Sequence, residues 1–222
     1  MPLVRIVLSI GGCLGFALVV AQSCFAQSLA TADQLPIWKT IKTGTYRSVI
    51  NLREALQAAD CALPSPTVSG RTLMPIPCQL GDAANEIMGR REFELSRAPN
   101  EIELVRVSGK DLGFAADSQP SLREIYQRAE GLGYALCPPE AGPQLRLQYT
   151  NQRIGEFLLI AMRPIRDYDG DLTIFSVGNG GSGLSLVGHS GVPDFRVPAS
   201  NSFVFMRAPQ AGADDIARAT DH

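Results

Sequence analysis

Apolar side chains recur at helical spacing in three stretches of the chain between residues 51 and 133. The first expected helix begins at Asn51, with Glu54 as its capping partner. The second is expected to begin at Asp82, where the aspartate would cap the helix. The third follows Ser121, because Ser121 and Glu124 have the spacing of a capping box before an apolar face. Glycines follow the second and third stretches, so both of these helices should end there.

Alternating polar and apolar residues predict strands over much of the remaining chain. An imperfect alternation covers residues 101–107, with a break of phase at Leu104 and Val105. Turn residues separate the later strands, which are expected at 145–149, 156–163, 172–177, 184–187 and 203–207. Helices with one strand therefore come first and strands follow. The predicted fold class is α+β, with N-terminal helices and one strand followed by a mostly antiparallel β-meander.

The start of the chain reads as an export signal. Arg5 precedes an uninterrupted run of apolar and small residues at 6–21, and small residues at 24 and 26 suit cleavage after Ala26. Residues 1–26 are therefore expected to be a signal peptide, and the mature protein to be periplasmic or secreted. An uncleaved anchor or a lipoprotein would be the alternatives, but the run is short for a spanning helix and no good lipobox follows it.

Composition shifts predict how the rest of the chain is organised. We expect an irregular lead-in at 27–41 and a single α+β domain at 42–207, with a Pro-rich loop at 62–77. The polar segment 208–222 is expected to be a disordered tail.

The charge balance narrows the classes of partner. The chain has 20 basic and 22 acidic residues, a net charge of −2, and no block of lysine or arginine. Nucleic acid is therefore not an expected partner. The chain also lacks a basic amphipathic face, so we expect no stable membrane insertion after signal cleavage. The expected partner is an envelope or extracellular ligand of unknown identity.

Three cysteines follow the expected cleavage site. We pair Cys61 with Cys78 in a disulfide, because the Pro-rich segment between them reads as a surface loop whose ends lie close. Three buried free thiols are the alternative. Cys137 is left without a partner, and a role as nucleophile is disfavoured because the chain has only 2 histidines to serve as a base.

The clearest candidate for metal binding is an aspartate cluster between two expected strands. Asp167, Asp169 and Asp171 alternate along the chain, and Gly170 could turn the backbone so that their oxygens converge on a structural Ca²⁺. The alternative is a hairpin turn, in which Asp and Gly are chosen for turn geometry. The turn interpretation is the stronger, because the spacing departs from that of an EF-hand. No other cofactor is expected.

Two glycine motifs and a few acidic residues are the remaining candidates for a catalytic or nucleotide site. The glycines at 178–183 fit G-x-G-x-x-G, but a strand is expected to follow them where a nucleotide site needs a helix. The segment around Ser190 lacks the final glycine of a nucleophile elbow, and the chain has no second well-placed histidine. Glu156 could act with Glu101 or Glu103 as a carboxylate pair, yet strand-edge carboxylates are usually solvated, so no catalytic residue is assigned.

Four blocks of the chain resemble those of an uncharacterised family of bacterial hypothetical proteins. The blocks are GDAANEIMGR, GLGYALCPPEAGPQLRLQY, GEFLLIAMRPI and DYDGDLTIFSVG. The resemblance covers roughly residues 42–207 and supports treating them as one unit. The Pro-rich insertion and the signal are departures from the family pattern. The family has no known function, so the resemblance implies nothing about chemistry.

Together these features favour a non-enzymatic binding, inhibitory or structural component of the cell envelope. The alternative is a carboxylate-dependent hydrolase acting on envelope polysaccharide or peptide, and a third is a regulatory domain of cytoplasmic type that acquired a signal. A hydrolase would have a deep cleft with convergent carboxylates. A binding module would expose aromatic residues such as Trp38 or Phe195.

Overall fold

The computed structural model describes residues 35–59, 61 and 78–208. The expected signal peptide (1–26), the Pro-rich loop (62–77) and all but the first residue of the expected tail (208–222) lie outside them. No helix in the described part of the chain has the length and apolarity needed to cross a membrane.

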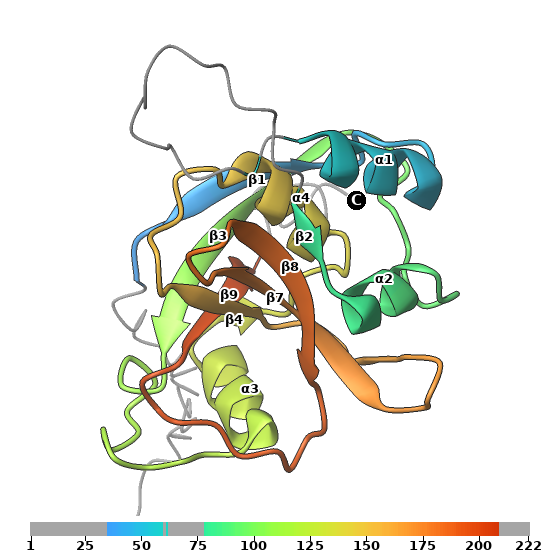
Figure 1. Ribbon diagram of the computed structural model, residues 1–222. Helices are drawn as coiled ribbons and strands as arrows, with labels where there is room; N and C mark the ends of the chain where they lie inside the picture. The colour runs from blue at the N-terminus through green and yellow to red at the C-terminus, as the bar shows by residue number, and fades with distance from the viewer. Residues whose placement is uncertain (1–34, 60, 62–77, 209–222) are drawn as a thin grey trace, which may run out of the picture. The chain divides into compact units, whose positions relative to one another are not determined.

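The described residues form one large, curled, mixed β-sheet with four short helices packed against it (Figure 1). The sheet runs in the order β1-β3-β9-β5-β7-β8-β2, with β4 also paired to β9 and β6 to β7. The strands are β1 (Lys39–Thr43), β2 (Gln79–Leu80), β3 (Asn100–Ser108), β4 (Tyr134–Ala135), β5 (Phe157–Ile160), β6 (Ile165–Arg166), β7 (Leu172–Asn179), β8 (Leu184–Ser190) and β9 (Ser202–Arg207).

The predicted order of helices followed by an antiparallel meander is wrong. Strands β1, β2 and β3 come from the N-terminal half and belong to the same sheet as the later strands. The last strand, β9, lies between β3 and β5, antiparallel to β3 and parallel to β5, and β2 is parallel to β8. The prediction assumed that successive strands pair as hairpins, whereas much of this sheet is built from strands distant in the sequence.

The three expected helices are present, with some changes at their ends. They are α1 (Val49–Ala58), α2 (Asp82–Met88) and α3 (Leu122–Gly131). The capping box of α3 is confirmed, since Ser121 and Glu124 bond each other's backbone N–H groups. Helix α1 begins earlier than expected, because Ser48 caps it by accepting from the N–H of Asn51.

The strand predicted at 145–149 is instead the second half of helix α4 (Ala141–Gln148) and its C-cap residue, Tyr149. The alternation of polar and apolar residues led to the wrong prediction because it placed Arg146 on the solvent side of a strand. Arg146 is in fact fully buried, as is its neighbour Leu145. The helix also packs closely on the sheet at Gly142, where an added Cβ would lie 2.7 Å from the ring of Phe175. In the view of Figure 1, α4 lies above the sheet and α3 below it.

The other strand predictions agree with the structure to within a few residues. Strand β3 includes the predicted break of phase, as Leu104 and Val105 are adjacent and both fully buried. The predicted strand at 156–163 is shorter and forms β5, while β7, β8 and β9 cover the last three predictions. Strand β1 begins within the expected lead-in at 27–41, because its residues pair with the outer edge of β3.

The cysteines lie as the sequence indicated. Cys61 and Cys78 are joined by a disulfide across 17 positions of the chain, and both are buried. Cys137 is a buried free thiol, and its burial raises its pKa far above the usual value. An uncharged, inaccessible thiol is a poor nucleophile, so this cysteine belongs to the core.

Candidate functional site

A cleft of about 710 Å³ lies where β3, β5 and β9 come together. Polar atoms make up most of its surface, and two arginines but only one acidic residue are among the side chains that line it. The lining residues are Trp38, Arg106, Tyr149, Arg153, Ile154, Gly155, Glu156, Phe157, Ser200, Asn201 and Ser202.

The strand register brings the central side chains together. Arg106 on β3 pairs with Val204 of β9, so Ser202, two residues earlier on β9, is its diagonal neighbour. Ser202 in turn pairs with Leu158 of β5. Glu156 comes two residues before Leu158, so it lies at the end of the sheet where Ser202 begins β9. Residues far apart in the sequence therefore meet because β9 lies between β3 and β5.

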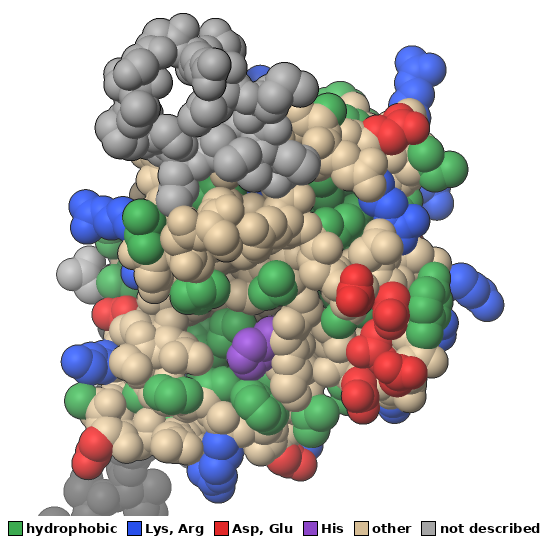
Figure 2. All heavy atoms as spheres, viewed as in Figure 1, with side chains coloured by type: hydrophobic (Ala, Val, Ile, Leu, Met, Phe, Trp, Pro, Cys, Tyr) green, Lys and Arg blue, Asp and Glu red, His purple; other side chains and the backbone are tan. Residues whose placement is uncertain are grey.

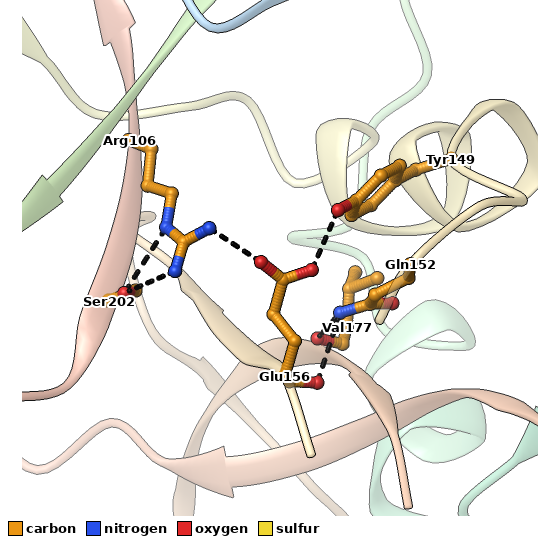
Figure 3. Close-up of polar contacts among 6 residues, drawn as sticks. All are labelled: Arg106, Tyr149, Gln152, Glu156, Val177 and Ser202. Carbon is orange, nitrogen blue, oxygen red and sulfur yellow. Dashed lines mark hydrogen bonds and ion pairs between the residues drawn. The ribbon is translucent and has the colours of Figure 1, made fainter. Parts of the chain in front are cut away.

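Glu156 is the centre of the polar network in the cleft (Figure 3). Its Oε1 accepts from Nη1 of Arg106 at 2.5 Å, and its Oε2 accepts from the hydroxyl of Tyr149 at 2.7 Å. Arg106 also donates from Nε and Nη2 to the hydroxyl oxygen of Ser202, at 3.3 and 3.2 Å. The Glu156 side chain is 11% exposed and that of Arg106 is 41% exposed, so the arginine forms the accessible half of the pair.

A second layer of hydrogen bonds holds the turn that carries Glu156. The side-chain amide nitrogen of Gln152 donates to the carbonyls of Glu156 and Val177, at 3.1 and 3.0 Å. Its side-chain oxygen accepts from Arg146 at 2.6 Å, and its backbone oxygen accepts from Asn179 at 2.8 Å. The side chain of Gln152 is thus fully bonded inside the protein, so the turn is rigidly placed.

Arg146 is a buried cation without a carboxylate partner among the described residues. Besides Gln152, its guanidinium donates to the backbone oxygens of Tyr149 and Gly178, all of which are neutral acceptors. Burial lowers its pKa to about 10, and Tyr149 acts in the opposite direction. The guanidinium therefore remains charged at neutral pH, and it bonds the backbone oxygen of Tyr149, a residue that lines the cleft.

Tyr149 links the aromatic and charged parts of the cleft. Burial, and then its hydrogen bond to Glu156 and the charge of that residue, raise its pKa to about 12, so it stays neutral and donates. Trp38 meets its ring edge to face, with centroids 5.1 Å apart. The ammonium of Lys39 lies 5.0 Å from the centre of the Tyr149 ring, which adds another positive charge near the cleft.

The predicted aspartate cluster forms a turn. Oδ1 of Asp167 accepts from the N–H of Asp171 at 2.9 Å, and Oδ2 accepts from the hydroxyl of Thr173 at 3.1 Å. Gly170 has a φ of 90°, as this tight turn requires. No group of three potential metal ligands is assembled anywhere in the described residues. Asp167 therefore serves the turn, and calcium binding by Asp167, Asp169 and Asp171 stays a prediction.

Acidic side chains do gather on the face shown in Figure 2, over the region of α2 and the β6–β7 turn. Glu86 of α2 reaches this turn and accepts from the N–H of Tyr168 at 3.0 Å. The ring of Tyr168 lies 5.4 Å from the guanidinium carbon of Arg90. These contacts give the surface a structural role in joining α2 to the sheet.

The carboxylates considered for hydrolysis do not converge. Glu156 lies in the cleft, whereas Glu101 and Glu103 are exposed on β3 and do not line it. Glu103 instead lies 4.0 Å from Nε of Arg207. Glu156 is thus the one acidic side chain among the described lining residues.

The remaining sequence candidates are also placed by the fold. The glycine motif at 178–183 covers the end of β7 and the connection to β8, and a strand follows it where a nucleotide site needs a helix. His189 and Ser190 are on β8, where His189 meets the ring of Phe195 edge to face at 5.5 Å. Phe195 lies outside the cleft, while Trp38, the other aromatic residue expected to bind, lines it.

Most of the cleft has no signature in the sequence. No local motif contains Arg106, Tyr149 or Ser202. These residues come together only through the order of the strands in the sheet. The alternation at 145–149 predicts Arg146 on the solvent face of a strand. Glu156 stands out only as a charge at the start of an apolar run.

Comparisons of the chain with protein-family models, curated proteins and solved structures each gave no match. The resemblance of its sequence blocks to a bacterial family stays a prediction.

Proposed function

We propose that this protein is exported and acts as a non-enzymatic binding protein whose cleft takes a polar, anionic ligand. The observation that carries the proposal is the excess of positive charge. Arg106 and Arg153 line the cleft against the single carboxylate of Glu156, and the buried Arg146 bonds the backbone of the lining residue Tyr149. A concave site with charge of one sign attracts ligands of the other sign.

The guanidinium of Arg106 is preorganised to bind an anion. A guanidinium has five N–H donors, and three of those of Arg106 are used by Ser202 and Glu156. The two that remain belong to Nη1 and Nη2. The existing bonds hold the side chain in place before a ligand arrives, which reduces the entropy cost of binding. Arg153 is exposed and has no ion pair with another described residue, so it can add a second contact.

Export is supported by the leader and the disulfide. The Cys61–Cys78 bond would persist in an oxidising compartment, where the signal at 1–26 would deliver the chain. The proposed ligand would therefore be met in the periplasm or outside the cell.

The hydrolase alternative has less support. Hydrolysis by paired carboxylates requires a proton donor and a second carboxylate near the scissile bond. Both oxygens of Glu156 already accept hydrogen bonds, and the described lining residues include no second acid. Binding without turnover is the function that this geometry fits better.

Isothermal titration of the mature protein with citrate, inorganic phosphate and a neutral polyol tests the proposal. We expect the two anions to bind and the polyol not to bind. Arg153→Gln should weaken anion binding by about tenfold, the worth of one charge-assisted contact of about 1.4 kcal/mol. The control is Arg163→Gln, because Arg163 is exposed but lies outside this cleft. Anion binding that is absent, or equal in the two variants, would overturn the proposal.

A further inference from the structure

We infer that the ligand is an acidic saccharide, in which a carboxylate is bound by the arginines and a sugar ring lies on Phe157. This inference rests on the proposed function and specifies its ligand. It depends on an exposed aromatic ring at the rim of the cleft, on the polar lining, and on the cations already described.

Phe157 is an exposed ring in a fixed position. It is the first residue of β5, and its register partner on β7 is Gly178. An added Cβ on Gly178 would lie 2.5 and 2.7 Å from two ring carbons, so the ring lies directly over the glycine backbone. Phe157 is nevertheless 52% exposed. The ring therefore packs on the glycine, while about half of the residue remains exposed and lines the cleft.

An aromatic face suits the apolar side of a sugar. The π-face carries partial negative charge, and the C–H groups on one side of a pyranose ring carry partial positive charge, so the two surfaces attract and exclude water. The same sugar presents hydroxyl groups at its edge. Ser200 and Asn201 line the cleft and lie just before β9, where they can exchange hydrogen bonds with such hydroxyls.

The arginines indicate which kind of saccharide fits. A neutral sugar would leave the charge of Arg153 without a partner and would offer no anion to the two remaining N–H groups of Arg106. A carboxylate on the sugar matches the paired N–H groups of a guanidinium. Inorganic phosphate would use the arginines but not the ring, and an apolar acid would meet a mostly polar lining. Of these ligands, the acidic saccharide uses the charges, the polar side chains of Ser200 and Asn201, and the ring together.

The test titrates the mature protein with a trimer of galacturonic acid, with the fully methyl-esterified trimer, and with citrate. We expect the acidic trimer to bind at least about tenfold more tightly than its neutral ester, as for loss of one charged contact. Phe157→Ala should weaken binding of the acidic trimer by about tenfold, the worth of stacking on an aromatic ring, and leave citrate binding unchanged. Phe195→Ala is the control, because Phe195 is an exposed aromatic residue outside the cleft.

The outcomes separate this inference from the proposed function. If citrate binds and Arg153→Gln weakens it, but the acidic trimer binds no more tightly than citrate, the saccharide inference is wrong and the anion-binding function stands. Equal loss of citrate and trimer binding in Phe157→Ala would also overturn the stacking step. Tight binding of the neutral ester would overturn the saccharide inference, and failure of every anion to bind would overturn both. Circular dichroism of each variant verifies that it folds.

Discussion

Phe157 and Gly178 face each other across β5 and β7, and the ring occupies the space in which any other residue at 178 would place its Cβ. A glycine inside a strand leaves backbone uncovered, and a cross-strand aromatic ring can cover it. The glycine in turn leaves room for the ring, which lines the cleft. The pair thus links the packing of the sheet to the geometry of the proposed binding surface.

Replacing this glycine should damage both stability and binding. Gly178→Ala would put a methyl group 2.5 Å from the Phe157 ring, so the ring must move, and we expect the free energy of unfolding to fall by about 1–3 kcal/mol. Binding of the acidic trimer should weaken as well. The matched control is Gly180→Ala, whose Cβ would be 3.9 Å from the ring, an ordinary contact expected to change stability by no more than about 0.5 kcal/mol. Urea titrations of both variants measure the difference, and equal stabilities would contradict it.

The turn at Asp167 gives a prediction about calcium. Asp167→Ala removes the acceptor for Asp171 N–H and Thr173 Oγ1 and should lower the free energy of unfolding by about 1–3 kcal/mol. Asp169→Ala, at an exposed position, should change it by less than about 0.5 kcal/mol. We expect the thermal melts of the wild type in Ca²⁺ and in EDTA to coincide. A Ca²⁺-dependent rise in Tm that both substitutions abolish would instead establish the metal site.

The disulfide is expected to stabilise the folded protein. Closing a loop of this length is worth about 3 kcal/mol in the chain-entropy description. For a chain of this size, adding reductant should therefore lower the Tm by about 6–12 °C. Cys61→Ala/Cys78→Ala should melt low with or without reductant. Cys137→Ala is the control, since it keeps the bond and should remain sensitive to reductant. A wild-type Tm that reductant leaves unchanged would be inconsistent with a stabilising bond.

Local signals in the sequence predicted part of the local structure, although Asp82 does not cap α2, whose N-cap residue is Gly81. The Ser121–Glu124 capping box depends on residues three positions apart, and it forms as predicted. The break of phase at Leu104 and Val105 is also present, because β3 buries both residues. Alternation failed at Leu145 and Arg146, since it assumes that a charged residue faces water. Here the charge is buried and bound by carbonyl groups, which a pattern of polarity does not reveal.

The sheet order and the cleft depend on contacts that no short pattern encodes. Strand β9 resembles a final hairpin strand, yet it pairs with β3 and β5. Arg106 and Glu156 are 50 positions apart in the sequence, and they meet because β9 lies between β3 and β5. The excess of arginine over acidic residues in the cleft could therefore not be predicted from the sequence, because the overall charge of the chain is nearly balanced. The disulfide was predictable because its loop has a local composition of its own.

The raised pKa of Tyr149 predicts how stability changes at high pH. The folded protein holds the phenol proton up to about pH 12, while the unfolded chain loses it near the ordinary value of 10. The unfolded state therefore binds fewer protons between these values, and stability falls as pH rises. This contribution is fully present below pH 10 and is lost by about pH 12. Tyr149→Phe cannot ionise, so it should lose less stability than the wild type across that window.

Glu156→Gln separates the causes of the shift. The amide still offers an oxygen to the Tyr149 hydroxyl but carries no negative charge, so the pKa of Tyr149 should fall and remain above its ordinary value because the ring is still buried. Ultraviolet titration of tyrosinate, taken as the difference from the same variant carrying Tyr149→Phe, reports this pKa directly. A titration identical to that of the wild type would mean that Glu156 does not act on Tyr149, and the hydrogen-bonded centre proposed for the cleft would have to be abandoned.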